Sequence, residues 1–139
     1  MSYKIIGKYI KELNFNIPNT KAFFLIAENI SNYKVNIDIK SNQIKENIIE
    51  VLTTLSLSSV KDKIDNINTN IVFASVVEFQ NNNIEKREIE KIILVKVPSE
   101  IYGELRKIFV SLFESSGFKD IKINENVDFQ KLYEMRKIQ

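Results

Sequence analysis

The side chains that most often do chemistry in proteins are either absent from this chain or scattered along it. Histidine and cysteine do not occur, which excludes a histidine general base, a Ser-His-Asp triad and any site built on imidazole or thiolate. The serine pairs at 58–59 and 115–116 therefore lack a histidine to activate them, and only a Ser-Lys arrangement stays open. We expect no catalytic residue, no metal site, no cofactor and no enzyme.

The charged residues and glycines are arranged for a surface rather than for a reaction. The 18 Asp and Glu residues and the 20 Lys and Arg residues interleave along the chain and give a net charge of +2. No carboxylate pair stands in an apolar setting as an acid/base couple would, and no basic cluster marks a nucleic-acid surface. Three glycines are too few for a phosphate-binding loop. A sheet that stacks single-stranded bases on aromatic side chains remains an alternative class.

No segment of the sequence is suited to a membrane. No apolar run approaches the roughly 18 residues that a spanning helix needs. The first residues, MSYKIIGKYIKEL, lack the apolar region and the small-residue cleavage site of a signal peptide. These features predict a soluble, cytoplasmic protein that binds other molecules rather than converting them.

Strands are predicted in the first half of the chain, where apolar and polar residues alternate with a period of two. The four segments are residues 3–17, 33–40, 49–57 and 71–79. Pro18-Asn19 ends the first strand, and Ser41-Asn42-Gln43 predicts a turn between the second and the third. The fourth segment is apolar on both faces, which indicates a strand covered by helix on one side and by another element or subunit on the other.

The first of these segments alternates over most of its length. Only Ile6 and Ile10 break the pattern. The parity that we expect to be buried carries Tyr3, Ile5, Tyr9, Leu13, Phe15 and Ile17.

Helices are predicted in the second half of the chain. Residues 84–96 suit either a short helix or a strand, and Pro98 is expected to end that element. Ser99 is then a good N-cap for a helix with a single apolar stripe, and Gly117 is a typical residue to close it. A last helix is expected from about 128 to 137, with its inward positions at Phe129, Leu132 and Tyr133.

Strands followed by helices predict one α+β domain over residues 1–139, with strands within about 3–80 and helices within about 84–138. The simplest arrangement is a four-stranded antiparallel meander with the C-terminal helices packed on one face. Such a sheet has two open edges and one open face, which are hazards unless they are paired or used. Oligomerisation or a polypeptide client would cover them.

Several motifs then follow one another from residue 9 to about residue 135. YIKELNFNIPN (9–19) carries an aliphatic-x-Phe-x-x-Pro-Asn ending, and the later strands contain VNIDI (35–39), EVLTTLSLS (50–58) and IVFASVVE (71–78). A helix opening is formed by Pro98, Ile101, Tyr102 and Arg106, with Gly103 in place of a second proline, and the last helix begins with NVDFQKLY (126–133). Together and in this order, these segments resemble the SecB family of export chaperones.

The resemblance implies a holdase that works without ATP and binds unfolded polypeptides along hydrophobic grooves. It also implies a homotetramer, built as a dimer of dimers with helices between the sheets. The implied peptide-binding residues are aromatic, namely Phe23, Phe24, Tyr33, Phe73 and Phe79. The implied oligomer interface lies on the long helix, at Ile101, Leu105, Ile108 and Leu112. The alternative for both sets is packing inside the core.

The resemblance further implies docking to the SecA motor through acidic residues of the sheet. Glu12 and Glu78 are the candidates for this docking, whereas Asn16 and Val76 stand where the family carries acidic residues. A less acidic surface weakens attraction to a cationic partner. Two roles therefore stay open: an export chaperone, and a chaperone dedicated to one client, such as a toxin–antitoxin partner.

Overall fold

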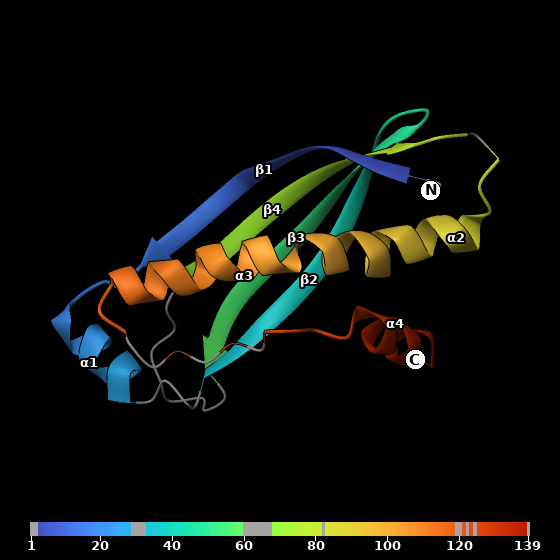
Figure 1. The fold of residues 1–139 in the computed structure, drawn as a ribbon. Coiled ribbons are helices and arrows are strands. Elements are labelled where there is room, and N and C mark those ends of the chain that lie inside the picture. Colours follow the sequence, from blue (N-terminus) through green and yellow to red (C-terminus); the bar gives the residue numbers. More distant parts are fainter. Residues whose placement is uncertain are drawn as a thin grey trace.

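The fold is described by a computed structural model for residues 3–28, 33–59, 68–81, 83–118, 121, 123 and 125–138. The elements are β1 (Tyr3–Asn16), α1 (Thr20–Glu28), β2 (Tyr33–Lys45), β3 (Ile48–Ser59), β4 (Asn68–Phe79), α2 (Lys86–Lys91), the π-helical turn η2 (Ile92–Lys96), α3 (Val97–Ser115) and α4 (Phe129–Ile138). Figure 1 shows the long helix that contains α2 and α3 crossing one face of a twisted sheet, with α4 beside it. The predicted α+β class is confirmed.

The sheet is antiparallel and its strand order is β1-β4-β3-β2. β2, β3 and β4 form a meander, but β1 lies beside β4, so the predicted simple meander is wrong at its first strand. The reason is the connection from β1 to β2, which contains helix α1 and crosses to the far edge of the sheet. Alternation indicates the face that a side chain takes, but it does not identify the neighbouring strand.

Strand β1 contains two bulges, one between Ile5 and Gly7 and one between Ile10 and Glu12. Each bulge adds one residue without a partner and turns the following side chains to the other face. The bulges explain why Ile6 and Ile10 break the alternation of the sequence. Between them Tyr9 lies opposite Ala74, on the sheet face that carries no helices, so the prediction that Tyr9 points inward is wrong.

Strand β2 is longer than the sequence predicts. Ser41 pairs with Val51 and Gln43 with Ile49, so the turn predicted at Ser41-Asn42-Gln43 is wrong, and the chain reverses at residues 46–47 instead. The end of β2 from Ser41 onward is exposed. Polar residues are tolerated there because this part of the edge strand extends beyond the core, where a polar pattern no longer distinguishes a strand from a turn.

One continuous helix runs from Lys86 to Ser115 through α2, η2 and α3. Residues 84–96 were predicted to be either helix or strand, and they are helical from Lys86 onward. The prediction that Pro98 ends this element is wrong. Pro98 has no N–H for the α-helical ladder, and the wide π turn directly before it absorbs the interruption. Ser99 is not an N-cap, because its hydroxyl donates to the carbonyl oxygen of Val95 within the helix (2.6 Å).

The end of α3 follows the prediction. Gly117 has a φ of 95°, a left-handed conformation that favours glycine. The N–H of Phe118 donates to the carbonyl oxygen of Phe113 (2.9 Å) and the N–H of Gly117 to that of Glu114 (3.1 Å). The rings of Phe113 and Phe118 lie 5.8 Å apart. These contacts form a Schellman motif with its apolar partner, and they turn the chain back over the core.

The core lies between the sheet and the helices in two clusters. The larger cluster contains the inner stripe of α3 packed on β3 and β4, and its α3 members are Ile101, Tyr102, Leu105, Phe109 and Phe113. The smaller cluster lies near the start of β1 and joins Tyr3 and Phe79 to Ile92 and Val97 of the long helix. The long helix is therefore packed on the sheet from Ile92 to Phe113.

Helix α4 begins close to the predicted position. The side chain of Asp128 accepts a hydrogen bond from the N–H of Lys131 (3.0 Å), which caps the first turn. Phe129 and Tyr133 are buried, but Leu132 is 46% exposed, so its predicted inward position is wrong. Leu132 faces the edge of β2 rather than the core. Within the part of the chain that the structure describes, no helix combines the length and apolar character needed to cross a membrane.

Candidate polypeptide-binding groove

A groove runs between edge strand β2 and the helical layer. It consists of two adjoining cavities of about 650 and 190 Å³. Ile39, Leu94, Tyr133 and Arg136 line both cavities, so the two adjoin and are described together as one groove. One wall is β2 from residue 37 to residue 42, the base is the end of α2 with η2, and the other wall is α4.

The β2 wall offers unpaired backbone groups. β2 is an edge of the sheet, so among the described residues the N–H and C=O groups on its outer side have no neighbouring strand. The six residues that line the groove span about 20 Å at roughly 3.3 Å per residue. Ile37 and Ile39 turn toward the helices and are half-buried, whereas Asp38 and Lys40 take the opposite face. This wall suits an extended chain in which alternate side chains are apolar.

The opposite wall adds exposed apolar surface. Leu132 borders the groove from α4, and Met135, one turn further along the same helix, is 54% exposed. Methionine is flexible and adapts to differently shaped partners. Arg136 lies at the same wall and, among the described residues, forms no ion pair. The groove combines aliphatic side chains such as Leu94 with polar ones such as Lys40 and Glu90, and beside a strand edge this mixed lining suits an extended chain segment.

The aromatic residues singled out in the sequence are not brought together at this groove. Phe23 contacts Phe24 and Phe118, with ring centroids 5.5 and 4.9 Å away. Phe24 is 57% exposed on α1, and Tyr33 is half-buried at the start of β2. Phe73 is buried in the larger core cluster, and Phe79 lies in the smaller one, six residues further along β4. Only Phe24 of the five offers a largely open ring.

Sequence reasoning missed both kinds of residue that line the groove. The aliphatic ones are Ile37, Ile39, Ile93, Leu94 and Leu132, and the polar ones are Asp38, Lys40, Ser41, Asn42, Glu90 and Arg136. A signal for Ile93 and Leu94 existed in the run IILV at residues 92–95, which has more consecutive apolar residues than one buried stripe of a helix needs.

The residues predicted for an oligomer interface divide into two kinds. Ile101 and Leu105 are fully buried against the sheet of their own chain and have no surface left for a second copy. Ile108 and Leu112 are half-buried and retain open surface. A larger apolar surface lies along edge strand β1, where four side chains are more than 40% exposed: Ile6, Tyr9, Ile10 and Leu13.

The acidic residues lie on the sheet face without helices, but far apart. Glu12 is opposite Val72 and Glu78 is opposite Lys4, which puts six residues of β4, roughly 20 Å, between them. Glu50 was missed by sequence reasoning and lies on the same face, directly opposite Val76. Its carboxylate accepts a hydrogen bond from the Tyr9 hydroxyl, a contact that raises the pKa of Tyr9.

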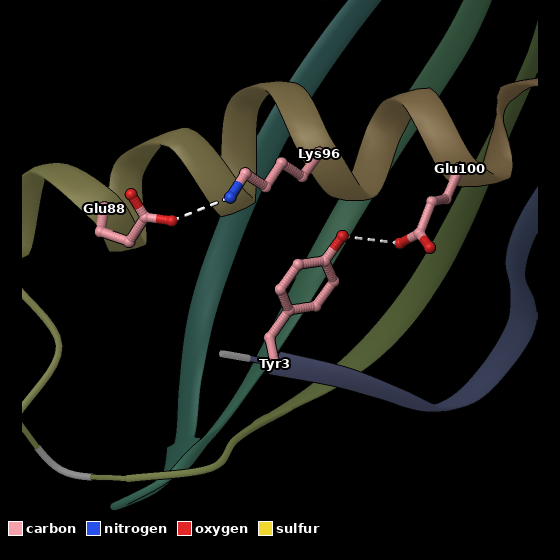
Figure 2. A network of polar contacts seen from close by, with 4 residues as sticks. All are labelled: Tyr3, Glu88, Lys96 and Glu100. Carbon is pink, nitrogen blue, oxygen red and sulfur yellow. Dashed lines mark hydrogen bonds and ion pairs between the residues drawn. The ribbon is translucent and has the colours of Figure 1, made fainter. Parts of the chain in front are cut away.

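Polar contacts fix the long helix on strand β1. The Tyr3 hydroxyl donates to Oε2 of Glu100 (2.8 Å), and Nζ of Lys8 lies 2.6 Å from Oε1 of Glu104. Figure 2 shows the first of these contacts reaching from β1 to the helix. Burial, together with the neighbouring carboxylate, raises the pKa of Tyr3 to about 12. Among the described residues, no three acidic side chains gather in a way that could hold a metal ion.

Comparison with known proteins agrees with this architecture. The model of the family described as "Preprotein translocase subunit SecB" matches residues 1–139. A SecB-named protein of Pelagibacter ubique is 39% identical over 135 residues, covering 97% of this chain and 96% of its own length. The protein-export protein SecB of Burkholderia lata is 26% identical over 135 residues, covering 96% of this chain and 81% of its own length.

A solved structure supports the fold independently. The SecB-like chaperone of Mycobacterium tuberculosis, solved with a ChAD peptide from the HigA1 antitoxin, superposes with a TM-score of 0.66 at 9% identity. The match covers 91% of this chain and 88% of that one. The full-length family match, the 39% identical relative and the shared fold agree with one another. The chain therefore belongs to the SecB family of protein-export chaperones.

Proposed function

We propose that this protein is a holdase that binds unfolded polypeptides in the groove between β2 and α4, without nucleotide and without catalysing a reaction. The observation that carries the proposal is the combination of an unpaired strand edge with exposed apolar side chains across a channel about 20 Å long. A SecB family chaperone needs such a surface for non-native chains. We also infer that it acts in the cytoplasm.

The groove suits many clients because its two walls recognise different features. Hydrogen bonds to the edge of β2 depend on the client's backbone and not on its sequence. The apolar base and the α4 wall take alternate side chains of an extended segment. A folded protein presents neither free backbone nor a continuous apolar segment, so this groove selects for unfolded chains.

The test of this function compares two surfaces of similar exposure. The variant Leu132→Asp places charge on the α4 wall of the groove. We expect it to lose about tenfold or more of its capacity to suppress aggregation of a chemically unfolded protein, because carboxylates are costly to bury in an apolar contact. The matched control is Ile44→Asp, since Ile44 is 52% exposed against 46% for Leu132 but lies outside the groove. Equal suppression by both variants would contradict the proposal.

The peptide-binding role predicted for the five aromatic residues remains a proposal, and we restrict it to the most exposed of them. Phe23 and Phe24 of α1 make a separate aromatic contact, of which Phe24 is open. We propose Phe24 as a second contact for long clients, with the half-buried Tyr33 at the start of β2 as a further candidate. Phe24→Ser should weaken binding of a long unfolded chain and leave the binding of a short peptide in the groove unchanged.

We further propose that the protein assembles as a tetramer. The exposed apolar side chains of β1 and the half-buried Ile108 and Leu112 of α3 support this assembly. Several grooves on one particle would make modest contacts effective through avidity. Mass measurement in solution tests the proposal, and a monomer at micromolar concentration would contradict it.

Two alternative roles remain proposals: an export chaperone that docks to the SecA motor, and a chaperone dedicated to one client protein. Glu12 and Glu78 give the sheet face without helices two exposed acidic groups, which favours a basic partner, whereas Glu50 on the same face is buried and paired with Lys11. The overall charge of +2 favours a dedicated chaperone instead, because it weakens long-range attraction to such a partner. Purification of the protein from its native cells separates them: many unfolded precursors indicate export, and one stoichiometric partner indicates a dedicated role.

A further inference from the structure

The π turn η2 lies at the base of the groove, between its two walls. It contacts β2 on one side and α4 on the other, and it continues without a break into α2 and α3. Its hydrogen bonding is that of a π helix, because the N–H of Val97 donates to the carbonyl oxygen of Ile92, five residues earlier. The turn therefore holds one residue more than an α-helical turn would.

The side chains around the turn are aligned by this extra residue. Ile92 and Val97 are both fully buried in the smaller core cluster. Five residues of a regular α-helix rotate by about 500°, so these two side chains would point about 140° apart without the π turn. The π turn brings both onto the sheet. It leaves the neighbouring Ile93 and Leu94 to face the groove.

An ion pair on the outer side of the helix reflects the same geometry. Oε1 of Glu88 lies 2.9 Å from Nζ of Lys96, eight residues further along. Figure 2 shows the two side chains reaching toward each other along the helix. Two α-helical turns hold about seven residues, so the eighth is the residue that the π turn adds. The ion pair lowers the pKa of Glu88.

We propose that the π turn Ile92–Lys96 is the specificity-determining base of the groove, because its extra residue presents two adjacent apolar side chains, Ile93 and Leu94, to the client. The inference rests on the proposed holdase function and names the part of the groove that selects the client. The preferred occupant is an extended segment in which bulky apolar residues alternate with polar ones.

The decisive variant lacks Ile93. Without this residue Glu88 and Lys96 are seven positions apart, which is two turns of an α-helix, so their ion pair and the burial of Ile92 and Val97 are retained. We therefore expect the deletion to fold and to differ from the wild type mainly at the base of the groove. Leu94→Ser keeps the π register and removes the other apolar side chain. Val110→Ser is the control, a half-buried position of α3 outside the groove.

The measurement is the fluorescence anisotropy of a labelled peptide of alternating valine and threonine residues. The deletion of Ile93 and Leu94→Ser should each raise the Kd by about tenfold or more, and Val110→Ser by less than about twofold. A folded deletion variant that binds as tightly as the wild type overturns the inference and leaves the holdase proposal intact. A wild type that binds no unfolded chain overturns the holdase proposal, and this inference with it.

A second measurement does not depend on how the deletion variant folds. The chain has no cysteine, so Leu94→Cys introduces a single thiol at the base of the groove. We expect the peptide to slow alkylation of this thiol about tenfold or more when it is bound. Unchanged alkylation in the presence of a peptide that demonstrably binds would place the client elsewhere and overturn the inference.

Discussion

The two edges of the sheet differ in regularity and in the way the helices cover them. β1 carries two bulges and four exposed apolar side chains, and its polar contacts with α3 run through Glu100 and Glu104. β2 pairs with β3 without interruption from Tyr33 to Gln43 and borders an open groove. A bulged edge resists pairing with an arbitrary strand, whereas a regular edge accepts one.

The difference teaches which partner each edge fits. An irregular edge with fixed apolar positions matches a partner of fixed geometry, and a second copy related by two-fold symmetry is the simplest such partner. A regular edge beside an adaptable apolar wall matches many extended chains. We therefore infer that β1 serves assembly and β2 serves clients.

The largest expected effect comes from placing charge on the β1 edge. The double variant Ile10→Asp, Leu13→Asp alters two side chains that are 44% and 41% exposed. We expect the mass in solution to fall from about four chains to one or two, because carboxylates brought together at a two-fold interface repel one another and resist burial. Light scattering coupled to gel filtration measures this effect.

The control for that variant is the same substitution on the other edge strand. Ile44→Asp alters an exposed residue of β2 and should leave the mass unchanged. If the β1 double variant keeps the wild-type mass, the assignment of β1 to assembly is wrong.

A smaller effect is expected when the first bulge is removed. Ile5 pairs with Val77 and Gly7 with Val76, so deletion of Ile6 joins two residues whose partners are already adjacent. The fold should persist, but the straighter edge should self-associate at concentrations several-fold lower than the wild type, because bulges protect edges from open-ended pairing. Turbidity against protein concentration measures this effect, and a deletion variant as soluble as the wild type would show that the bulge has no protective role.

The bulges also mark the limit of what the sequence predicted. Alternation predicted the existence of all four strands, and the apolar stripe of α3 with Gly117 predicted that helix and its end. The reversed parity at Tyr9 was not predictable, because a bulge leaves the composition of a strand unchanged. The position of β1 beside β4 depends on contacts between residues far apart in the chain, which a local pattern does not contain.

The groove was harder to predict than the fold for a related reason. Its walls come from β2, η2 and α4, and only their packing brings Ile39, Leu94 and Tyr133 together. The aromatic residues were natural candidates for binding. Phe73 and Phe79 are instead buried in the core, where packing of their rings stabilises the fold. The π turn was hidden because Pro98 indicates a helix boundary in most sequences.

A moderate loss of folding stability is expected when the contact between β1 and the long helix is removed. Tyr3→Phe removes the hydroxyl that donates to Glu100, and we expect a loss of about 1–2 kcal/mol in the free energy of unfolding. The pKa of Tyr3 is raised to about 12, so its protonated form stabilises the fold fully below pH 10. That contribution is lost as the pH rises from 10 to 12, with a slope of at most about 1.4 kcal/mol per pH unit.

Urea titrations at several pH values test this dependence. The wild type should lose stability between pH 10 and 12 more steeply than Tyr3→Phe does, because the variant has no phenol at this position. Parallel profiles for the two proteins would show that Tyr3 titrates as it does in the unfolded chain.

The smallest expected effect concerns the ion pair between Lys8 and Glu104, 2.6 Å apart on the surface. Both side chains are exposed, so solvent and salt screen their attraction. A double-mutant cycle with Lys8→Gln and Glu104→Gln should give a coupling free energy of about 0.2–1 kcal/mol, and this value should fall further in high salt. If β1 buries this pair against a second copy, the coupling should instead exceed about 1 kcal/mol and depend on protein concentration, because desolvated charges lose that screening. The size of this coupling therefore reports on whether the β1 edge is covered in solution.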